Sequence, residues 1–223
     1  MSADRMTVLS KMMEQGVIPV FYHRDVEVCK SVIQACADGG AKCIEFTNRG
    51  DFASQVFLEV NRHFAKADPS VIMGVGSIVD APTAALYIAY AARFVVGPLL
   101  NADVAKMCNR RKIAYCPGCG TLSEMGLAEE LGCEIVKMFP GSTVGGPEFV
   151  KSVLAPSPWT RIMPTGGVDC TEESLVKWFG AGVVCVGMGS NLITKAALEA
   201  KDYKGIETKV RDTVELIAKI RAK

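Results

Sequence analysis

Short apolar segments recur along the whole chain at intervals of about twenty to thirty residues, and this spacing constrains the fold more than any other feature. The segments are rich in residues that favour β-strands, and the stretches between them show helical periodicity. The eight segments are Val17–Tyr22, Cys43–Phe46, Val71–Met73, Phe94–Val96, Ile113–Tyr115, Ile135–Met138, Ile162–Met163 and Val183–Val186. Because one strand, one helix and two loops fill such an interval, the sequence predicts eight consecutive β/α units.

Eight such units fit a closed ring of parallel strands. The predicted fold class is therefore α/β, a single (β/α)8 TIM barrel over residues 1–223 with an N-terminal helix before the first strand. A doubly wound open sheet is the main alternative, because it is assembled from the same units. No break in composition marks a second domain, and the 223 residues, 49% of them hydrophobic, suffice for one sizeable core.

Charge and hydropathy narrow the expected partners. The net charge is +1, and no run of basic residues with interleaved aromatics occurs, so we expect neither nucleic acid nor membrane as a partner. The most apolar window, residues 81–100, contains Pro82 and Arg93 and predicts a buried helix followed by a strand. The weak polar face of that helix suggests packing against another subunit. Because the first residues show no apolar signal core, we expect a cytoplasmic protein.

The cysteines do not predict a metal centre. Nine cysteines without a secretion signal are expected to be reduced thiols, mostly in the core. Cys116 and Cys119 form a C-x-x-C pair, but the sequence offers neither a second such pair nor an H-x-x-x-H to complete a zinc site. A thioredoxin-like pair would need a helix N-terminus in a smaller α/β unit. We therefore predict no metal and no cofactor.

Lys137 stands inside an apolar strand, Ile135–Met138, which ends just before Pro140. Burial lowers the pKa of an ammonium group, and the neutral amine is a nucleophile towards carbonyl carbon. The alternative is a structural lysine whose flexible stem carries the charge to solvent. Active sites of TIM barrels lie at the C-terminal ends of the strands, and this position favours a catalytic amine.

Glu45 and Arg49 carry charge at the end of the second predicted strand. A carboxylate at a barrel mouth can move protons, and an arginine there can bind a substrate carboxylate with two parallel hydrogen bonds. The alternative is an ion pair between Glu45 and Arg49 that stabilises the loop.

Glycine-rich segments follow the seventh and eighth predicted strands, at residues 165–167 and 187–190, and each leads towards a helix. Glycines let backbone N–H groups approach an anion, and a helix N-terminus favours negative charge. Loops at these two places form the usual phosphate site of a barrel. The alternative is that the glycines only make tight turns between strand and helix.

Five segments together resemble the 2-keto-3-deoxy-6-phosphogluconate (KDPG) aldolase family in order and spacing. They are Glu45-Phe46-Thr47-Asn48-Arg49, Gly74-Val75-Gly76-Ser77, Cys116-Pro117-Gly118, Lys137-Met138-Phe139-Pro140 and Pro164-Thr165-Gly166-Gly167. The resemblance implies a trimeric (β/α)8 barrel and a metal-free class I aldolase. It also implies that the C-x-x-C match is a Pro-Gly turn with cysteines beside it.

The resemblance also implies roles for single residues. Lys137 would be the Schiff-base lysine, Glu45 the general acid/base and Arg49 the ligand of the pyruvyl carboxylate. The other substrate-binding residues would be Ser77, Pro98 and Phe139 near the reacting centre, and Thr165, Gly166, Gly167, Gly189 and Ser190 at the phosphate end.

Several positions depart from the family pattern. Ser77 stands in place of the usual threonine, Asn48 in place of a commonly aliphatic residue, and Met188 lies between the glycines of the last loop. The predicted reaction is cleavage of KDPG, a small phosphorylated 2-keto acid, by a homotrimer. The alternatives are the same chemistry on 4-hydroxy-2-oxoglutarate or on the galactonate epimer, a sugar-phosphate-binding barrel without activity, and a barrel isomerase, which would leave Lys137 unexplained.

Overall fold

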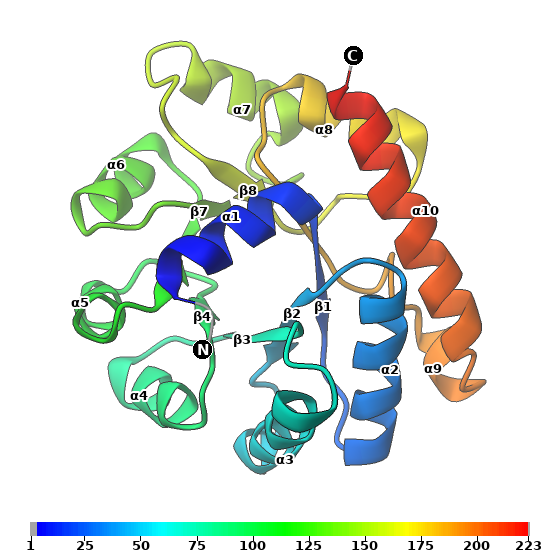
Figure 1. Cartoon of the computed structure of the whole chain (residues 1–223). Coiled ribbons are helices and arrows are strands. Elements are labelled where there is room, and N and C mark those ends of the chain that lie inside the picture. Colours follow the sequence, from blue (N-terminus) through cyan, green and yellow to red (C-terminus); the bar gives the residue numbers. More distant parts are fainter. Residues whose placement is uncertain (1–3, 223) are drawn as a thin grey trace.

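The strands of the protein form one parallel ring around a central axis (Figure 1). The computed structural model describes residues 4–222. Its strands are β1 (Val17–Phe21), β2 (Cys43–Thr47), β3 (Ile72–Gly76), β4 (Phe94–Val96), β5 (Ala114–Cys116), β6 (Gly118–Cys119), β7 (Val136–Met138), β8 (Ile162–Pro164) and β9 (Val186–Met188). Every pairing between these strands is parallel, as a succession of β/α units requires.

Two hydrogen-bonded sheets make up the ring, with strand orders β5-β4-β3-β2-β1-β9 and β6-β7-β8. Pro117 separates β5 from β6, because it has no N–H group to donate to a neighbouring strand. On the opposite side, Thr165 forms a parallel bridge with Gly187, and the N–H of Val184 donates to the carbonyl of Ile162 at 3.0 Å. These links close the ring, so the predicted TIM-like barrel is confirmed.

The helices cover the outside of the ring (Figure 1). They are α2 (Val26–Asp38), α3 (Ala53–Ala67), α4 (Ala81–Ala89), α5 (Ala102–Arg111), α6 (Leu122–Glu130), α7 (Gly146–Leu154), α8 (Glu172–Gly180), α9 (Lys195–Glu199) and α10 (Tyr203–Arg221). Short polar side chains fix several of the starts: Asp25, for example, accepts hydrogen bonds from the N–H groups of Glu27 and Val28 at the start of α2.

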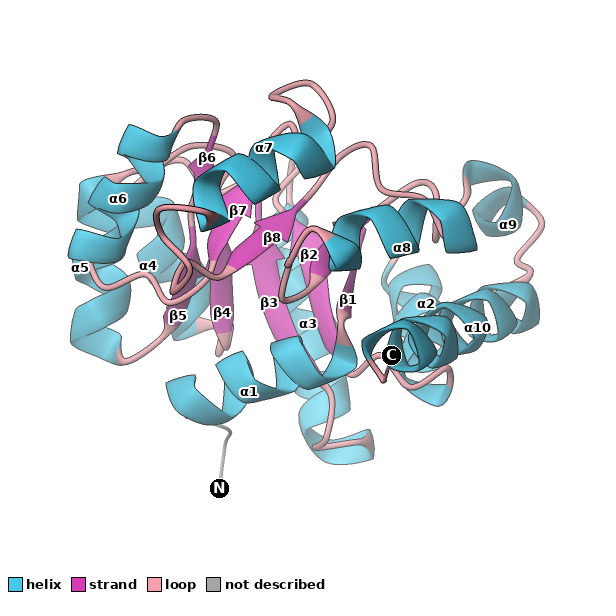
Figure 2. Cartoon of the chain, turned by 90° about the horizontal axis from the view of Figure 1, so that it is seen from above, coloured by secondary structure: helices cyan, strands magenta, loops and turns pink. Residues whose placement is uncertain are grey.

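The N-terminal helix α1 (Arg5–Gln15) lies across the end of the barrel at which the strands begin (Figure 2). The Gln15 amide fixes it there: its nitrogen donates to the carbonyls of Val17 and Cys43, and its oxygen accepts from the N–H groups of Lys42 and Cys43. These bonds satisfy backbone groups at the starts of β1 and β2. The predicted N-terminal helix thus serves as the floor of the barrel.

The interior of the barrel has two unlike halves. Near α1 it is filled with apolar side chains, which form one buried cluster: Val8, Leu9, Met12, Ile18, Cys43, Ile72, Phe94, Val96, Ala114, Cys116, Ile135, Met163 and Cys185. Towards the C-terminal ends of the strands, the buried Glu45 and Lys137 take the place of apolar side chains. Along the strands, the interior therefore changes from apolar side chains near α1 to charged side chains near the C-terminal ends.

Several glycines that follow the predicted strands belong to the strands themselves. Gly74 and Gly76 lie beyond the predicted end of the third strand at Met73 but belong to β3, and Gly187, which we predicted in the last glycine-rich loop, belongs to β9. A Cβ atom at Gly74 would overlap the ring of Phe94, and one at Gly187 would overlap the side chain of Thr165. Each of these glycines is the small partner of a bulky side chain on the neighbouring strand, which sequence alone does not distinguish from a turn glycine.

The prediction of a Pro-Gly turn at residues 117–118 is also wrong, because Gly118 belongs to β6 and pairs with Lys137.

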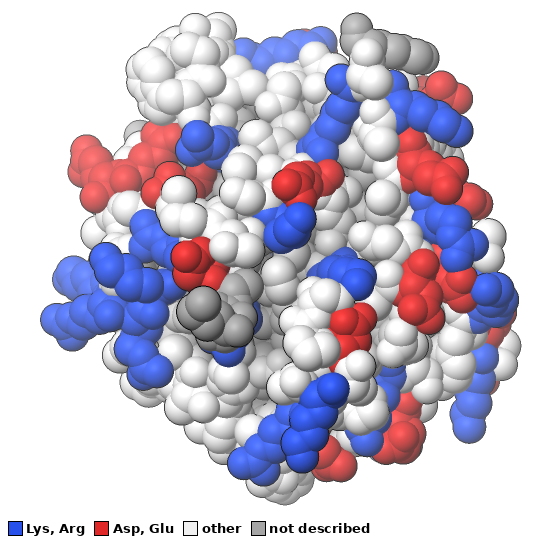
Figure 3. Space-filling model, viewed as in Figure 1, with Lys and Arg blue, Asp and Glu red and all other residues white. Residues whose placement is uncertain are grey.

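On the surface, positive and negative side chains are intermixed over the face that α1 crosses (Figure 3). A group of positive side chains stands out at the left of that view, where α5 ends in Arg110 and Arg111. Within residues 4–222, no helix is both long and apolar enough to cross a membrane.

Candidate active site

Glu45 is a buried carboxylic acid in the barrel interior. It lies in β2 and is only 1% exposed. Its Oε2 atom has no hydrogen-bond partner among the residues described. Gly76 on β3 makes room for the carboxyl, since a Cβ atom there would overlap it. Burial raises the pKa of Glu45, and the positive charges of Lys137 and Arg49 act in the opposite direction.

Lys137 points into the same interior from β7. Its side chain belongs to a residue that is 5% exposed, and its Nζ atom lies 4.6 Å from the centroid of the Phe139 ring. Burial lowers the pKa of this amine, and the charge of Arg49 lowers it further, whereas Glu45 acts in the opposite direction. The flexible stem does not carry the amine to solvent, so the structural alternative for Lys137 does not apply.

The pKa values of the two groups are shifted towards each other. The pKa of the carboxyl is raised and the pKa of the amine is lowered, so their proton affinities approach each other. A proton then moves between such groups at a smaller free-energy cost than in water. The arrangement can supply an uncharged amine as nucleophile and a buried acid in the same interior.

Arg49 stands above this pair, on the turn that follows β2. Its Nε atom donates to the Oγ atom of Ser77 at 3.2 Å. Its two terminal nitrogens make no hydrogen bond within residues 4–222, which leaves the fork of the guanidinium available for a carboxylate. Ser77 has a φ angle of 62°, a conformation that a β-branched threonine adopts only with strain. The pair of Arg49 and Ser77 also replaces the predicted alternative of an ion pair between Arg49 and Glu45.

A cleft of about 530 Å³ opens at the C-terminal ends of β1, β7, β8 and β9. Seven of the predicted substrate-binding residues line it together: Arg49, Phe139, Thr165, Gly166, Gly167, Gly189 and Ser190. Because the ring of Phe139 contacts both the cleft and the Lys137 amine, it connects the buried pair with the opening.

The far end of the cleft is suited to an anion. The N–H groups of Gly166, Gly167 and Ser190 donate to no acceptor within residues 4–222. The loops after β8 and β9 are held together by the Asn191 amide, which donates to the carbonyl of Val168 at 3.0 Å. Free N–H groups in a glycine-rich concavity favour an anion.

The expected contribution of helix N-termini at this end is absent from the described loops. The helix α8 begins only at Glu172 and α9 only at Lys195, so neither starts at the glycines themselves. Met188, which we predicted within the loop, is buried in β9 with its sulfur 3.2 Å from that of Cys170. An anion at this end would therefore be bound by backbone N–H groups of the loops and not by the start of α8 or α9.

Four predicted site residues lie outside the cleft lining: the predicted catalytic residues Glu45 and Lys137, which are buried below it, and the predicted substrate-binding residues Ser77 and Pro98. Ser77 contacts the cleft only through Arg49. Pro98 lies beside β6, where its carbonyl would collide with a Cβ atom at Gly118. Tyr22 and Lys195 are among the lining residues that were not predicted. Tyr22 directly follows β1, and this position was the signal that could have identified it; for Lys195 the sequence offers no comparable signal.

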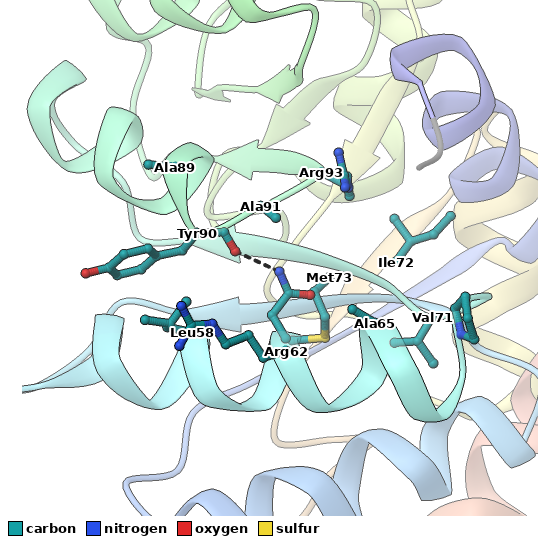
Figure 4. Close-up of a pocket in the computed structure, with 12 residues that line it drawn as sticks. Leu58, Arg62, Ala65, Val71, Ile72, Met73, Ala89, Tyr90, Ala91 and Arg93 are labelled. Carbon is teal, nitrogen blue, oxygen red and sulfur yellow. Dashed lines mark hydrogen bonds between the residues drawn. The ribbon is translucent and has the colours of Figure 1, made fainter. Parts of the chain in front are cut away.

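A second cleft of about 590 Å³ lies on the outside of the barrel, between α3 and the turn before β4 (Figure 4). The Asn61 amide donates to the carbonyl of Tyr90 at 2.8 Å across it. It adjoins Ile72 and Met73 at the start of β3, the end of the barrel opposite to the chemistry, and none of the predicted site residues lines it.

Within residues 4–222, no three His, Cys, Asp or Glu side chains are grouped as metal ligands would be. Cys116 and Cys119 are buried free thiols, and burial raises the pKa of Cys119 to about 12. Such a thiol is a poor nucleophile at neutral pH.

The sequence comparisons with known proteins agree on one family. The family model described as "Aldolase: KDPG and KHG aldolase" matches residues 8–209. The KHG/KDPG aldolase of Escherichia coli (strain K12) is 30% identical over 202 residues, which cover 89% of this chain and 91% of that protein. The 2-keto-3-deoxy-6-phosphogluconate aldolase of Zymomonas mobilis ZM4, solved with 3-phosphoglycerate, is 26% identical with a TM-score of 0.79, over 92% of this chain and 94% of that one.

A third protein shares the fold. The KDPG aldolase of Legionella pneumophila, with pyruvate captured as a covalent carbinolamine intermediate, has a TM-score of 0.83 at 22% identity, over 95% of this chain and 98% of that one.

Proposed function

The chain belongs to the KDPG and KHG aldolase family, and on that premise we propose that it is a class I aldolase that cleaves KDPG to pyruvate and glyceraldehyde 3-phosphate. The observation that carries the proposal is the buried Lys137 amine, whose pKa is lowered by burial, in the same interior as the buried Glu45 acid. An imine mechanism needs such a pair, whereas a barrel that only binds sugar phosphates does not.

The first half of the reaction forms the imine. The Lys137 amine attacks the C2 carbonyl carbon of the substrate and gives a carbinolamine, the type of intermediate captured with pyruvate in the Legionella protein. Glu45 donates a proton to the departing hydroxyl, water leaves, and a protonated imine remains on Lys137. Arg49 holds the substrate carboxylate, so the ketone is fixed relative to the amine.

The second half breaks the carbon–carbon bond. Glu45, now a carboxylate, takes the proton of the C4 hydroxyl, and the electrons of the C3–C4 bond move into the imine, which becomes an enamine. Glyceraldehyde 3-phosphate leaves, Glu45 returns the proton to C3, and water hydrolyses the resulting imine to pyruvate and the free amine. The anion end of the cleft would hold the phosphate, as supported by the free N–H groups of Gly166, Gly167 and Ser190.

A pyruvate-release assay tests the proposal. The purified protein is given KDPG, its galactonate epimer and 4-hydroxy-2-oxoglutarate, and kcat/KM is measured for each, with and without a chelator. We expect the highest kcat/KM for KDPG and no effect of the chelator. A preference for the unphosphorylated acid would overturn the substrate assignment, and the absence of pyruvate from all three would overturn the aldolase itself.

We further propose that the enzyme assembles as a homotrimer, as the family resemblance implies. The support is a set of exposed apolar side chains on or beside α4: Val79 is 48%, Leu86 40% and Leu99 46% exposed. Light scattering after size-exclusion chromatography should give three times the chain mass of 23.9 kDa, and Leu86→Glu should lower that mass.

A further inference from the structure

One buried hydroxyl close to the site has no part in the mechanism above. Tyr87 lies in α4 and is 0% exposed. Its ring packs edge-on against Phe57, with 5.1 Å between the ring centroids. Its hydroxyl donates to the Oδ1 atom of Asn48 at 2.8 Å. A buried hydroxyl needs a partner, and this one finds it in a residue adjacent to Arg49 in the chain.

Asn48 is the first residue after β2 and belongs to the turn that carries Arg49. Its backbone N–H donates to the carbonyl of Gly76 at 2.8 Å, so the pairing of β2 with β3 extends one residue beyond the strand. The N–H of Arg49 then donates back to the carbonyl of Thr47 at 2.8 Å, which makes a tight reversal. The side-chain bond from Tyr87 therefore acts on the residue at which the chain turns.

This turn has little of its own to hold it in one conformation. Gly50 has a φ angle of 113° and Phe52 one of 62°, both in the left-handed region. Phe52 precedes α3 without any side-chain capping bond and is 72% exposed. Contacts from outside the turn must therefore fix it, and Tyr87 supplies one through its hydroxyl.

An aromatic row extends this support. Rings of Tyr22, Phe46, Phe57 and Tyr87 follow one another, with centroid separations of 5.6, 5.9 and 5.1 Å. At one end the hydroxyl of Tyr22 lies against Gly50, where a Cβ atom would come within 2.8 Å of it. At the other end the hydroxyl of Tyr87 binds Asn48. Both ends of the row thus contact the segment 48–50, on either side of Arg49.

We propose that Tyr87 is a positioning residue for substrate binding: its hydrogen bond to Asn48 fixes the turn after β2, so that Arg49 presents its guanidinium fork to the substrate carboxylate. The inference rests on the proposed function, because it concerns how that carboxylate is bound. Asn48 departs from the family pattern at this position, and its bond to Tyr87 gives the departure a physical role.

The test measures carboxylate binding apart from turnover. The protein is incubated with increasing pyruvate, borohydride is added, and the fraction of chain carrying the adduct on Lys137 is measured by mass spectrometry. In Tyr87→Phe, the pyruvate concentration for half-maximal labelling should rise roughly five- to tenfold, the effect of about one lost hydrogen bond. The labelling at saturating pyruvate should remain that of the wild type, because the amine is untouched.

Two further variants separate positioning from general damage. Tyr90→Phe makes the same chemical change at the end of the same helix, where the hydroxyl has no hydrogen bond within residues 4–222, and should leave the half-maximal concentration unchanged. In an Arg49→Ala background, Tyr87→Phe should have no further effect, because the group through which it acts is gone.

The outcomes are distinct. If the wild type is labelled and Tyr87→Phe has the same half-maximal concentration, or if its effect persists in Arg49→Ala, the positioning role is overturned while the aldolase stands. If the wild type is not labelled at all, the proposed function fails and this inference fails with it.

Discussion

The two halves of the barrel interior lie along the same strands, but one is apolar and the other holds charged side chains. Near α1, Met12 and Phe94 belong to a fully buried apolar cluster. A few residues further along the strands, the same interior holds Glu45 and Lys137. The apolar half stabilises the fold, and it also shields the charged half from solvent on the side of α1. The pKa shifts of the two groups come first of all from burial, so the apolar half contributes to the proposed chemistry.

The largest difference between the halves should appear when Lys137 is changed. Lys137→Met keeps the length and the burial of the side chain but removes the nucleophile, so kcat/KM should fall by at least about 10⁴-fold. The measurement is pyruvate release under single-turnover conditions. Lys177→Met, at an exposed lysine paired with Glu173 on α8, is the control and should keep its activity.

Glu45 should come next. Glu45→Gln preserves the shape of the carboxyl but cannot exchange a proton, and kcat should fall by about 10²- to 10⁴-fold. Comparison of imine formation with cleavage, by rapid quench, shows which proton transfers depend on it. An activity within a few-fold of the wild type would assign the acid/base role to another group. Glu173→Gln on the surface provides the control.

In the apolar half near α1, a substitution should affect stability and not activity. Met12 is 0% exposed, and Met12→Ala should lower the free energy of unfolding by about 2–5 kcal/mol, through lost burial and the cavity left behind. Met6 lies on the same helix but is 67% exposed, so Met6→Ala should change the free energy of unfolding by less than about 0.5 kcal/mol. Urea unfolding measures both, and kcat of folded Met12→Ala should stay within about threefold of the wild type.

The smallest expected effect is on the pH dependence of the unfolding free energy. The pKa of Lys137 is lowered from its usual 10.5. Between the lowered pKa and 10.5 the unfolded chain binds more protons than the folded protein, so this residue makes the unfolding free energy rise with pH. Lys137→Met lacks this contribution. The unfolding free energy of Lys137→Met minus that of the wild type should therefore decrease as the pH is raised from 7 towards about 9.5, which urea unfolding at a series of pH values measures. A difference that stays constant over this range would mean that the pKa of the amine is not lowered.

Much of this architecture could be predicted from the sequence. The spacing of the apolar segments predicted the barrel, because each strand and helix leaves its own local periodicity. Lys137 stood out because a charged residue inside an apolar strand is unusual. Glycines were harder: Gly76 and Gly187 appeared to belong to turns, whereas they make room for Glu45 and Thr165. Such pairs are set by strand register, which the sequence does not display.

The bond between Tyr87 and Asn48 lay beyond sequence reasoning for the same reason. The two residues belong to different β/α units, and nothing local to either indicates the other. The predicted contribution of helix N-termini to a phosphate site was wrong, because the helices α8 and α9 begin several residues after the glycines.

The central claim is that the buried Lys137 nitrogen condenses with the ketone of the substrate. Borohydride reduction in the presence of pyruvate, followed by peptide mass spectrometry, tests it most directly. The account predicts one pyruvate-derived adduct, located on Lys137 and missing from Lys137→Met. An active protein that stays unmodified at Lys137, or that carries the adduct on a surface lysine instead, would contradict it.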